Sequence, residues 1–335
     1  SSLQPFLNLV QHHETSYRAI QSFIEKPPGK LRIFEIYPPK PLHSMALGSR
    51  IPALREDYKT GRLCGRYFLA TVGKLLAKNA PLPRQTPKIV VPGPVVTEPA
   101  SVVAPFDLVF VAVKATQITA IAPWLKALCH DRTVVCVLQN GVEQKTQFAP
   151  YVAEATVLPS VVWFPAQREP EASVWLRAKP RLTLPDVQGA ERVKHALRDT
   201  RCEVDVSADF LSVAWRKLLQ NAVAGLMVLT GRRAGMFARE DITALALAYL
   251  QEGLTVARAA GASLGDGVPQ EILTGFHRAP PDLSTSILTD REAGLPLEWD
   301  IRNGVVQRYG RIHHIPTPLS DVIVPLLAAA SDGPG

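Results

Sequence analysis

Residues 106–117, FDLVFVAVKATQ, contain six consecutive apolar residues that end at Lys114. An uninterrupted run of this kind is typical of a parallel strand that is buried on both faces. A second such run, RTVVCVLQNG at residues 132–141, ends at Asn140 and Gly141. The segment between the two runs, QITAIAPWLKALC, is predicted to form a helix. Two buried strands joined by a helix indicate a doubly wound parallel sheet.

The same α/β pattern continues to about residue 208, and the chain is predicted to be all-helical after that point. Strands are expected in ATVLPSVVWFPA (155–166), SVWLRAKPRLTLP (173–185) and RCEVDVS (201–207), with a helix in AERVKHALRDT (190–200). The sequence therefore predicts an α/β fold: a Rossmann-like domain over residues 88–208, followed by a helical domain over residues 209–335. Residues 1–87 form a third, atypical region.

The atypical region has its own expected elements. They are a helical stretch near residues 15–25, the apolar run LRIFEI (31–36) and a helix in GRYFLATVGKLLAKNA (65–80). A linker rich in proline and basic residues, PLPRQTPK (81–88), separates this region from the α/β pattern.

The composition excludes several classes of protein. With 47% apolar and 20% charged residues, the chain is globular rather than disordered. No apolar run reaches the roughly 18 residues that a membrane span needs, so we expect a cytoplasmic protein without membrane contact. The net charge of +7 is dispersed and no nucleic-acid motif occurs, which favours a solvated basic surface or a small anionic ligand over DNA. Four scattered cysteines predict reduced thiols, and neither disulfides nor a metal site.

The stretch AWRKLLQNAVAGLMVL at residues 214–229 is predicted to be a helix with one unusual row of side chains. Lys217, Asn221 and Gly225 are four residues apart and therefore lie on one face. A glycine inside a helix costs about 1 kcal/mol, so a close approach to the backbone is expected there. The lysine either extends to water from a core helix or works in a cleft.

Polar side chains follow both buried strands. Lys114 and Gln117 come after the first, and Asn140 and Gly141 after the second. In open α/β sheets ligands bind at this carboxyl edge, although an Asn-Gly pair is also an ordinary turn.

The helical half contributes Ser286, Asp290 and Glu298. Taken singly, Ser286 is equally explained as a helix cap, and Asp290 with Arg291 as a surface pair.

Taken together, these segments resemble a known family. FDLVFVAVKATQ, VLQNGVEQ, AWRKLLQNAVAGL and STSILTDREAGLPLEWDIRNGVVQRYGRIHHIPTP occur in this order. From about residue 89 to residue 327 the chain is similar to the 2-dehydropantoate 2-reductases, also called ketopantoate reductases. The resemblance implies a cytoplasmic NADP-dependent oxidoreductase of pantothenate and coenzyme A biosynthesis. It would reduce 2-dehydropantoate to (R)-pantoate in a cleft between a cofactor domain and a helical substrate and dimerisation domain.

The resemblance also implies roles for individual residues. Lys217 would be the general acid that protonates the ketone oxygen, and Glu298 would orient its ammonium group and hold a substrate hydroxyl. Lysine suits this role because a cleft lowers its pKa while its charge stabilises the developing alkoxide. Asn140 and Asn221 would bind the substrate, Ser286 would bind its carboxylate and Asp290 would brace that segment.

The implied cofactor is NADPH. The residues that would lie against it are Lys114, Gln117, Asn140, Gly141 and Glu298. Gly225 and Gly235 stand where many members of the family have asparagine, which would reduce the substrate contacts there and widen or simplify the pocket. A small 2-keto acid and a second copy of the chain are the implied partners.

One part of the family pattern is missing. The family opens on G-x-G-x-x-G after its first strand, whose glycines let the pyrophosphate approach a helix N-terminus. No such motif occurs in residues 1–87, where GRLCG at residues 61–65 is only a loose match. Residues 1–87 are thus either a divergent replacement or an unrelated leader. Two alternatives to the reductase remain: an inactive relative that binds no dinucleotide, and a reductase of another small 2-keto acid.

Overall fold

The structure is a computed structural model that describes residues 59, 95–164, 166–168, 174–176 and 179–332. The chain divides into two compact units, Ser1–Gly93 and Pro94–Gly335, and the elements below belong to the second unit. The elements expected near residues 15–25, 31–36 and 65–80 lie outside the described residues.

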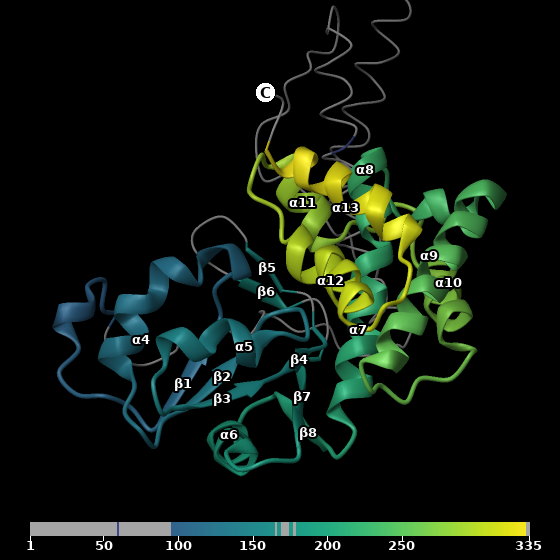
Figure 1. The fold of residues 1–335 in the computed structure, drawn as a ribbon. Coiled ribbons are helices and arrows are strands. Elements are labelled where there is room, and N and C mark those ends of the chain that lie inside the picture. Colours follow the sequence, from purple (N-terminus) through teal and green to yellow (C-terminus); the bar gives the residue numbers. More distant parts are fainter. Residues whose placement is uncertain (1–58, 60–94, 165, 169–173, 177–178, 333–335) are drawn as a thin grey trace, which may run out of the picture. The chain divides into compact units, whose positions relative to one another are not determined.

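The two apolar runs form neighbouring parallel strands, as predicted. The sheet has the order β1 (Leu108–Val111), β2 (Val134–Val137), β3 (Thr156–Pro159), and every pairing in it is parallel. Helix α4 (Ala122–Leu128) connects β1 to β2, and α5 (Gln144–Phe148) connects β2 to β3 (Figure 1). A short 3₁₀ turn at Pro99–Ser101 precedes β1, and three more lie within these connections, at Ala115–Gln117, Thr119–Ile121 and Ala149–Tyr151.

The remaining strands are partly antiparallel. Strand β4 (Val161–Val162) pairs antiparallel with β7 (Arg181–Pro185), and β7 pairs parallel with β8 (Glu203–Ser207) across helix α6 (Ala190–Leu197). Strands β5 (Ala166–Arg168) and β6 (Val174–Leu176) form a separate antiparallel ribbon. The doubly wound parallel arrangement therefore holds for β1–β3 and for β7–β8. The described part of the connection from β4 to β7 holds the β5–β6 ribbon and no crossover helix, in keeping with the antiparallel pairing of β4 and β7.

Only one of the two apolar runs is buried on both faces. Strand β2 is fully buried: Val135 packs with Phe148 on one face, and Cys136 packs with Leu184 on the other. In β1, however, Phe110 is 39% exposed, so the prediction of two buried faces is wrong for this strand. β1 is an edge strand of the described sheet, and Phe110 belongs to none of the hydrophobic clusters that the described residues form.

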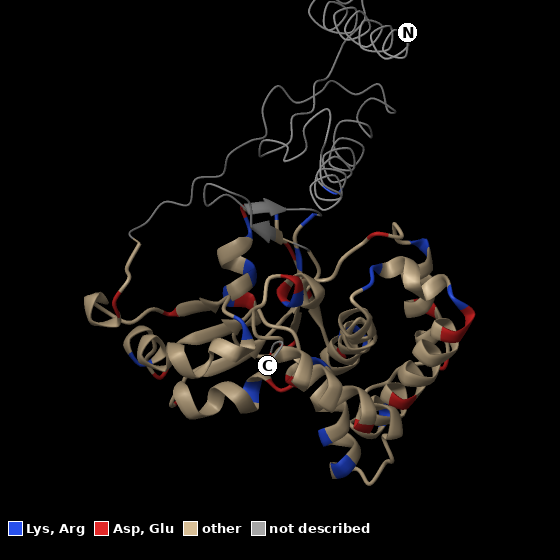
Figure 2. Cartoon of the chain, turned by 90° about the horizontal axis from the view of Figure 1, so that it is seen from above, with Lys and Arg blue, Asp and Glu red and all other residues tan. Residues whose placement is uncertain are grey.

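The second half of the unit is helical, as predicted (Figure 1). Its helices are α7 (Phe210–Val223), α8 (Gly225–Thr230), α9 (Glu240–Ala259), α10 (Val268–Arg278), α11 (Ser286–Glu292), α12 (Val305–Ile312) and α13 (Pro318–Ser331). A 3₁₀ turn at Ala234–Ala238 and a π-helical turn, η8 (Asp300–Gly304), interrupt the series. No helix among the described residues is long and apolar enough to cross a membrane. Basic and acidic side chains are interspersed over the described elements (Figure 2).

The predicted helix over 214–229 breaks at Ala224, between α7 and α8, and Gly225 opens α8. A Cβ at Gly225 would lie 2.9 Å from Asn303 Nδ2 and 3.0 Å from Leu327 Cδ1. Asn303 cannot easily retreat, because its amide donates to Ala222 O (2.8 Å) and Tyr249 Oη (3.0 Å). The group that approaches the backbone of Gly225 is thus the buried side chain of Asn303 in η8.

The idea that these two glycines enlarge a pocket is therefore wrong. Asn303 and Leu327 occupy the space beside Gly225, and a Cβ at Gly235 would lie 2.9 Å from the backbone oxygen of Pro281. Both glycines serve close packing within the helical half.

We predict that Gly225→Ala lowers the free energy of unfolding by about 1–3 kcal/mol, since overpacking of the Asn303 contact outweighs the better helix propensity of alanine. Gly275→Ala is the matched control. Gly275 lies in α10 with open space around its Cβ position, so this variant should gain about 0.4–1 kcal/mol. Urea unfolding of both variants measures the difference, and equal stabilisation by the two would contradict the packing argument.

Candidate active site

The segments that follow β2 and β3, residues 139–141 and 160–162, face helix α7 across a small hollow. Its polar lining comes from Gln139, Asn140, Ser160 and Lys217, together with the backbone of Gly141. Asn221 Nδ2 donates to Asn140 Oδ1 (3.0 Å). The row on α7 predicted from the sequence and the Asn-Gly turn after β2 therefore meet at one place.

Lys217 is half-buried in this hollow, and its ammonium faces an aromatic ring. Its Nζ lies 5.3 Å from the ring centroid of Trp163, whose Nε1 donates to Thr183 Oγ1 (2.8 Å). Among the described residues, no carboxylate lies within ion-pair distance of Lys217. Burial lowers the pKa of Lys217, and the nearby charge of Arg302 lowers it further. The ammonium is thus held by a cation–π contact and is easier to deprotonate than an ordinary lysine.

Glu298 is only 7% exposed and is fully engaged. Its Oε1 accepts the backbone N–H of Ala115 (3.0 Å), and its Oε2 accepts from Arg302 Nη2 (3.2 Å). The carboxylate therefore ties the loop after β1 to the helical half. The structure does not bring Glu298 into an ion pair with Lys217.

The other predicted residues of the helical half lie beside this carboxylate. Lys114 Nζ forms an ion pair with Asp290 Oδ1 (2.5 Å), and Asp290 is buried. The alternative of a surface pair with Arg291 is therefore wrong, because Asp290 faces the loop after β1. Ser286 Oγ accepts from Arg302 Nη2 (3.0 Å), so its side chain does not cap α11.

Gln117 and Gly141 have local structural roles. Gln117 Oε1 accepts the backbone N–H of Lys114 (3.0 Å) and so stabilises the turn after β1. Gly141 has a φ of 110°, which favours glycine, and its carbonyl accepts from Gln144 Nε2 (2.9 Å). Both residues shape the loops at the sheet edge.

Four residues of the site were not predicted from the sequence: Gln139, Ser160, Trp163 and Arg302. Gln139 is buried; its Nε2 donates to Val113 O (2.6 Å), but its Oε1 has no hydrogen-bond partner among the described residues. Arg302 sits in the π-helical turn, a kind of distortion that is frequent at functional sites. The sequence signal that could have identified Arg302 is its charge, four positions after Glu298 and next to the apolar Ile301.

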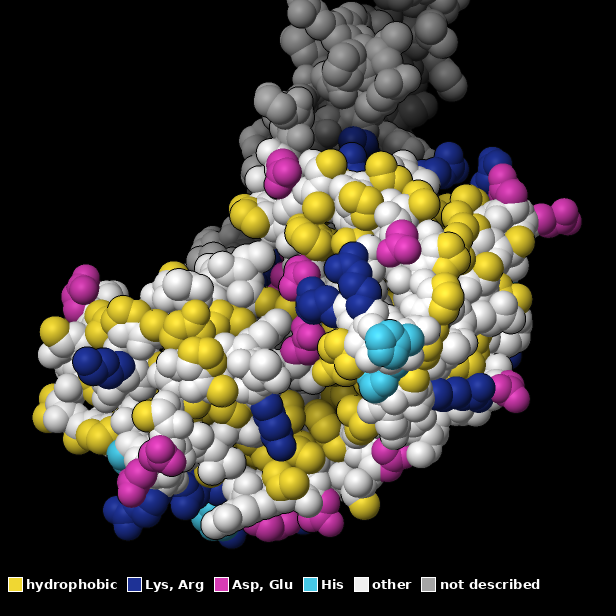
Figure 3. Space-filling model, viewed as in Figure 1, with side chains coloured by type: hydrophobic (Ala, Val, Ile, Leu, Met, Phe, Trp, Pro, Cys, Tyr) yellow, Lys and Arg dark blue, Asp and Glu magenta, His cyan; other side chains and the backbone are white. Residues whose placement is uncertain are grey.

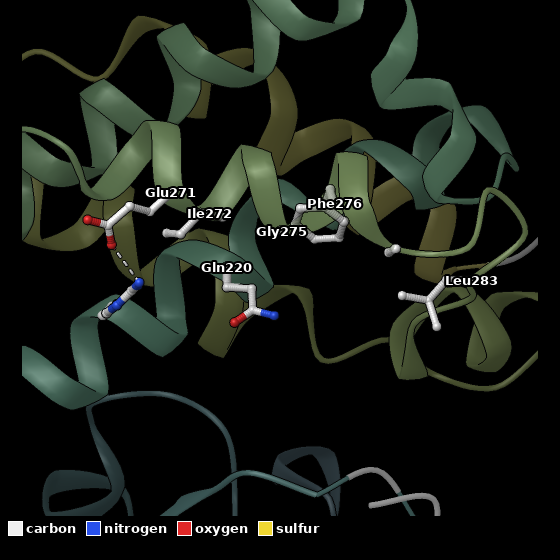
Figure 4. Close-up of a pocket in the computed structure, with 8 residues that line it drawn as sticks. Gln220, Glu271, Ile272, Gly275, Phe276 and Leu283 are labelled. Atoms are coloured by element: carbon white, nitrogen blue, oxygen red, sulfur yellow. Dashed lines mark hydrogen bonds and ion pairs between the residues drawn. The ribbon is translucent and has the colours of Figure 1, made fainter. Parts of the chain in front are cut away.

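A larger hollow of about 270 Å³ lies on the adjoining face of α7. Arg216 and Gln220 of α7 line it opposite Ile272 and Phe276 of α10 (Figure 4). Arg216 Nη2 forms an ion pair with Glu271 Oε2 (2.7 Å) at its rim. None of the residues predicted to act on a ligand lines it.

Charged side chains also cluster on the surface of the protein. In the space-filling view, basic and acidic side chains gather where the strands meet the helices, next to a recess with apolar walls (Figure 3). Arg308 of α12 forms ion pairs with Glu143 and Asp300.

Comparison with protein families agrees with this geometry. The model described as "Ketopantoate reductase PanE/ApbA" matches residues 79–189, and "Ketopantoate reductase PanE/ApbA C terminal" matches residues 209–331. The chain belongs to the ketopantoate reductase family. A different model, "Domain of unknown function (DUF6363)", matches residues 3–77.

Individual relatives fall into two groups. A 2-dehydropantoate 2-reductase of Mycobacterium tuberculosis is 53% identical over 247 residues, which cover 74% of this chain and 84% of that protein. An uncharacterised protein of Escherichia coli, YjjU, is 78% identical over 102 residues, or 30% of this chain and 29% of that protein. Among solved structures, a dimeric ketopantoate reductase of Staphylococcus aureus matches with a TM-score of 0.65 at 25% identity, over 71% of this chain and 81% of that one.

The ketopantoate reductase match thus begins where another family's match ends. The expectation that the N-terminal region does not match the reductase family is confirmed for residues 3–77, which match a different family model. This explains why no glycine fingerprint occurs ahead of β1.

The family is NAD(P)H-dependent, and the described residues fit one end of such a cofactor. The unpartnered Oε1 of Gln139 is a buried acceptor at the sheet edge, which suits the amide donor of a nicotinamide. The family's glycine turn for the diphosphate end does not occur in this sequence. The described residues therefore fit the nicotinamide end of the cofactor.

We predict that Lys217 titrates below the ordinary lysine value of 10.5, because burial and the charge of Arg302 both disfavour its ammonium form. The measurement is an NMR titration of ¹³C-dimethylated lysines, with Lys217→Met used to identify the signal. A midpoint at or above 10.5 would show that the ammonium is solvated or paired with a carboxylate.

Proposed function

We propose that this chain is a 2-dehydropantoate 2-reductase that reduces 2-dehydropantoate to (R)-pantoate with NADPH, in pantothenate and coenzyme A biosynthesis. Identity of 53% to a reductase of this name over most of the chain supports the substrate and the reaction. The observation that carries the proposal is the meeting of Lys217, Asn221 and Asn140 at the carboxyl edge of the sheet.

Lys217 is the proposed general acid. Reduction adds a hydride to C2 of the 2-keto acid and a proton to its oxygen, and the bound nicotinamide cofactor supplies the hydride. The Lys217 ammonium donates the proton to the developing alkoxide and stabilises its negative charge until the O–H bond forms. The contact with Trp163 holds the ammonium without a competing carboxylate.

Glu298 and the two asparagines are the proposed positioning groups. Asn140 and Asn221, already hydrogen-bonded to each other, present further amide donors and acceptors to the substrate. Glu298 holds a substrate hydroxyl and, through Ala115 and Arg302, fixes the distance between the sheet edge and the helices. Ser286 binds the carboxylate, and Asp290 braces this segment through Lys114.

The nicotinamide end of NADPH is proposed to bind against Gln139, Asn140 and Gly141, with Lys114 and Gln117 on the neighbouring loop. We also propose the division into residues 1–87, 88–208 and 209–335. The family matches at 79–189 and 209–331 support it. A homodimer is proposed on the similarity to a dimeric relative.

Purified full-length protein tests the proposal directly. NADPH is titrated into it, 2-dehydropantoate is added, and NADPH oxidation is followed by absorbance. Saturable binding followed by substrate-dependent oxidation is expected. Oxidation with other 2-keto acids but not with 2-dehydropantoate would select a different substrate, whereas no binding at millimolar NADPH would contradict any reductase function.

Removal of the Lys217 side chain should strongly reduce the rate of reduction. We predict that Lys217→Ala lowers kcat by about 10²-fold or more with an unchanged fold, as for removal of a general acid. Lys194→Ala, on the exposed surface of α6, is the control. An unchanged kcat in Lys217→Ala would remove this lysine from the chemistry.

The pH profile follows from the charge that Lys217 needs. Only its protonated form donates, so kcat should fall as the pH rises through the pKa of Lys217, which lies below 10.5. Steady-state rates over a pH series measure this limb. A rate that rises through the same range would instead identify Lys217 as a base.

A second candidate is an inactive family member that binds the keto acid but no dinucleotide. The observation in its favour is the match of residues 3–77 to another family, where a reductase carries its glycine turn. It predicts keto-acid binding by calorimetry with no NADPH binding in the same preparation.

A further inference from the structure

Arg302 is the most deeply buried charged side chain of the site, with 2% of its surface exposed. It stands in the π-helical turn η8, and its Nη2 donates to both Ser286 Oγ and Glu298 Oε2. Its Nε is buried and has no hydrogen-bond partner among the described residues. A guanidinium offers five N–H donors in a planar fork, so this one retains a donor that lacks an acceptor.

A buried donor without an acceptor is rare in folded proteins and points to a missing ligand. A carboxylate is the acceptor that matches the planar fork of arginine, since its two oxygens can take two parallel N–H bonds. Glu298 does not fill this role alone, because its other oxygen is taken by Ala115 N–H.

Ser286 lies at the surface in front of the Arg302 guanidinium and contacts it through Nη2. Its side chain is exposed, while Arg302 lies buried behind it and donates to its hydroxyl oxygen. The Ser286 hydroxyl therefore keeps its own proton for a second acceptor. An anion that reaches Ser286 meets a hydroxyl donor and a guanidinium together.

The charge of the neighbouring groups favours an anion at this point. Lys217 has no carboxylate partner among the described residues, and Lys114 is already neutralised by Asp290. Arg302 also lies close enough to Lys217 to influence its ionisation. Arg302 is paired with Glu298, so the positive charge that a bound carboxylate would compensate is that of Lys217.

We propose that Arg302 is the specificity-determining residue that anchors the substrate carboxylate, with Ser286 as its partner. The inference rests on the proposed function for the identity of the ligand. It adds a residue that makes a 2-keto acid, rather than a neutral ketone, the substrate of this site.

The test compares a charged and a neutral substrate in the wild type, Arg302→Met and Arg302→Lys. 2-Dehydropantoate and its amide differ only in the group that Arg302 is proposed to bind. For Arg302→Met we expect kcat/KM for the acid to fall by about 100-fold, mostly through KM, and that for the amide to change little. Arg302→Lys keeps the charge but loses the fork, so it should recover part of the acid preference.

A purely structural role gives a different result. If Arg302 only pairs with Glu298, acid and amide rates fall together and their ratio stays that of the wild type, which overturns the inference. Arg311→Met, on the exposed surface of α12, controls for loss of an arginine and should leave the ratio unchanged. If Arg302→Met does not fold, the ratio of kcat/KM for the acid to kcat/KM for the amide is measured in Arg302→Lys and Ser286→Ala instead. A ratio equal to that of the wild type in both variants would likewise overturn the inference.

Binding of pantoate without NADPH separates this inference from the proposed function. Calorimetry should show pantoate binding to the wild type and to Arg311→Met, and at least about tenfold weaker binding to Arg302→Met. If the wild type binds pantoate but oxidises no NADPH, the reductase proposal fails while the role of Arg302 stands. Equal binding by all variants, or no binding by the wild type at millimolar pantoate, would contradict the role of Arg302.

Discussion

The carboxylate of Glu298 links the two halves of the described unit. A carboxylate with so little exposure is stable only when its oxygens accept hydrogen bonds, and here one donor is the backbone of Ala115 after β1 while the other is Arg302. Breaking a buried pair by removing one partner costs about 3–5 kcal/mol, so both groups are held in place. The distance between the sheet edge and the helices follows from this contact.

The other contacts across the same boundary depend on that spacing. Asn140 meets Asn221, Lys114 meets Asp290, and Glu143 meets Arg308. Each joins a loop at the carboxyl end of a strand to a helix of the second half. Lys217 takes no part in these pairs. Its ammonium lies against Trp163 and is partly desolvated, which lowers its pKa and favours release of a proton.

Many of the strands, helices and site residues are predictable from the sequence. The remaining features are not, and the physical reasons can be named. The apolar runs that end at Lys114 and Asn140 predict parallel strands because only a buried strand tolerates such composition. The separation of four residues between Lys217 and Asn221 likewise predicts that both lie on one helix face. The exposure of Phe110 and the break at Ala224 depend instead on tertiary neighbours. Gly225 is explained by Asn303, a residue 78 positions away that no local pattern connects to it. Arg302 looks like an ordinary helical residue until the π-helical turn places it under Ser286.

The segment ahead of the reductase match is similar to another family, so hydride transfer by this chain needs a direct demonstration. The most direct measurement uses NADPH carrying deuterium at both C4 positions, with 2-dehydropantoate and the purified full-length protein, and mass spectrometry of the product. A reductase that binds the cofactor beside Asn140 and Lys217 yields pantoate with a single deuterium at C2. Pantoate without deuterium, or no pantoate at all, would contradict hydride transfer in this site.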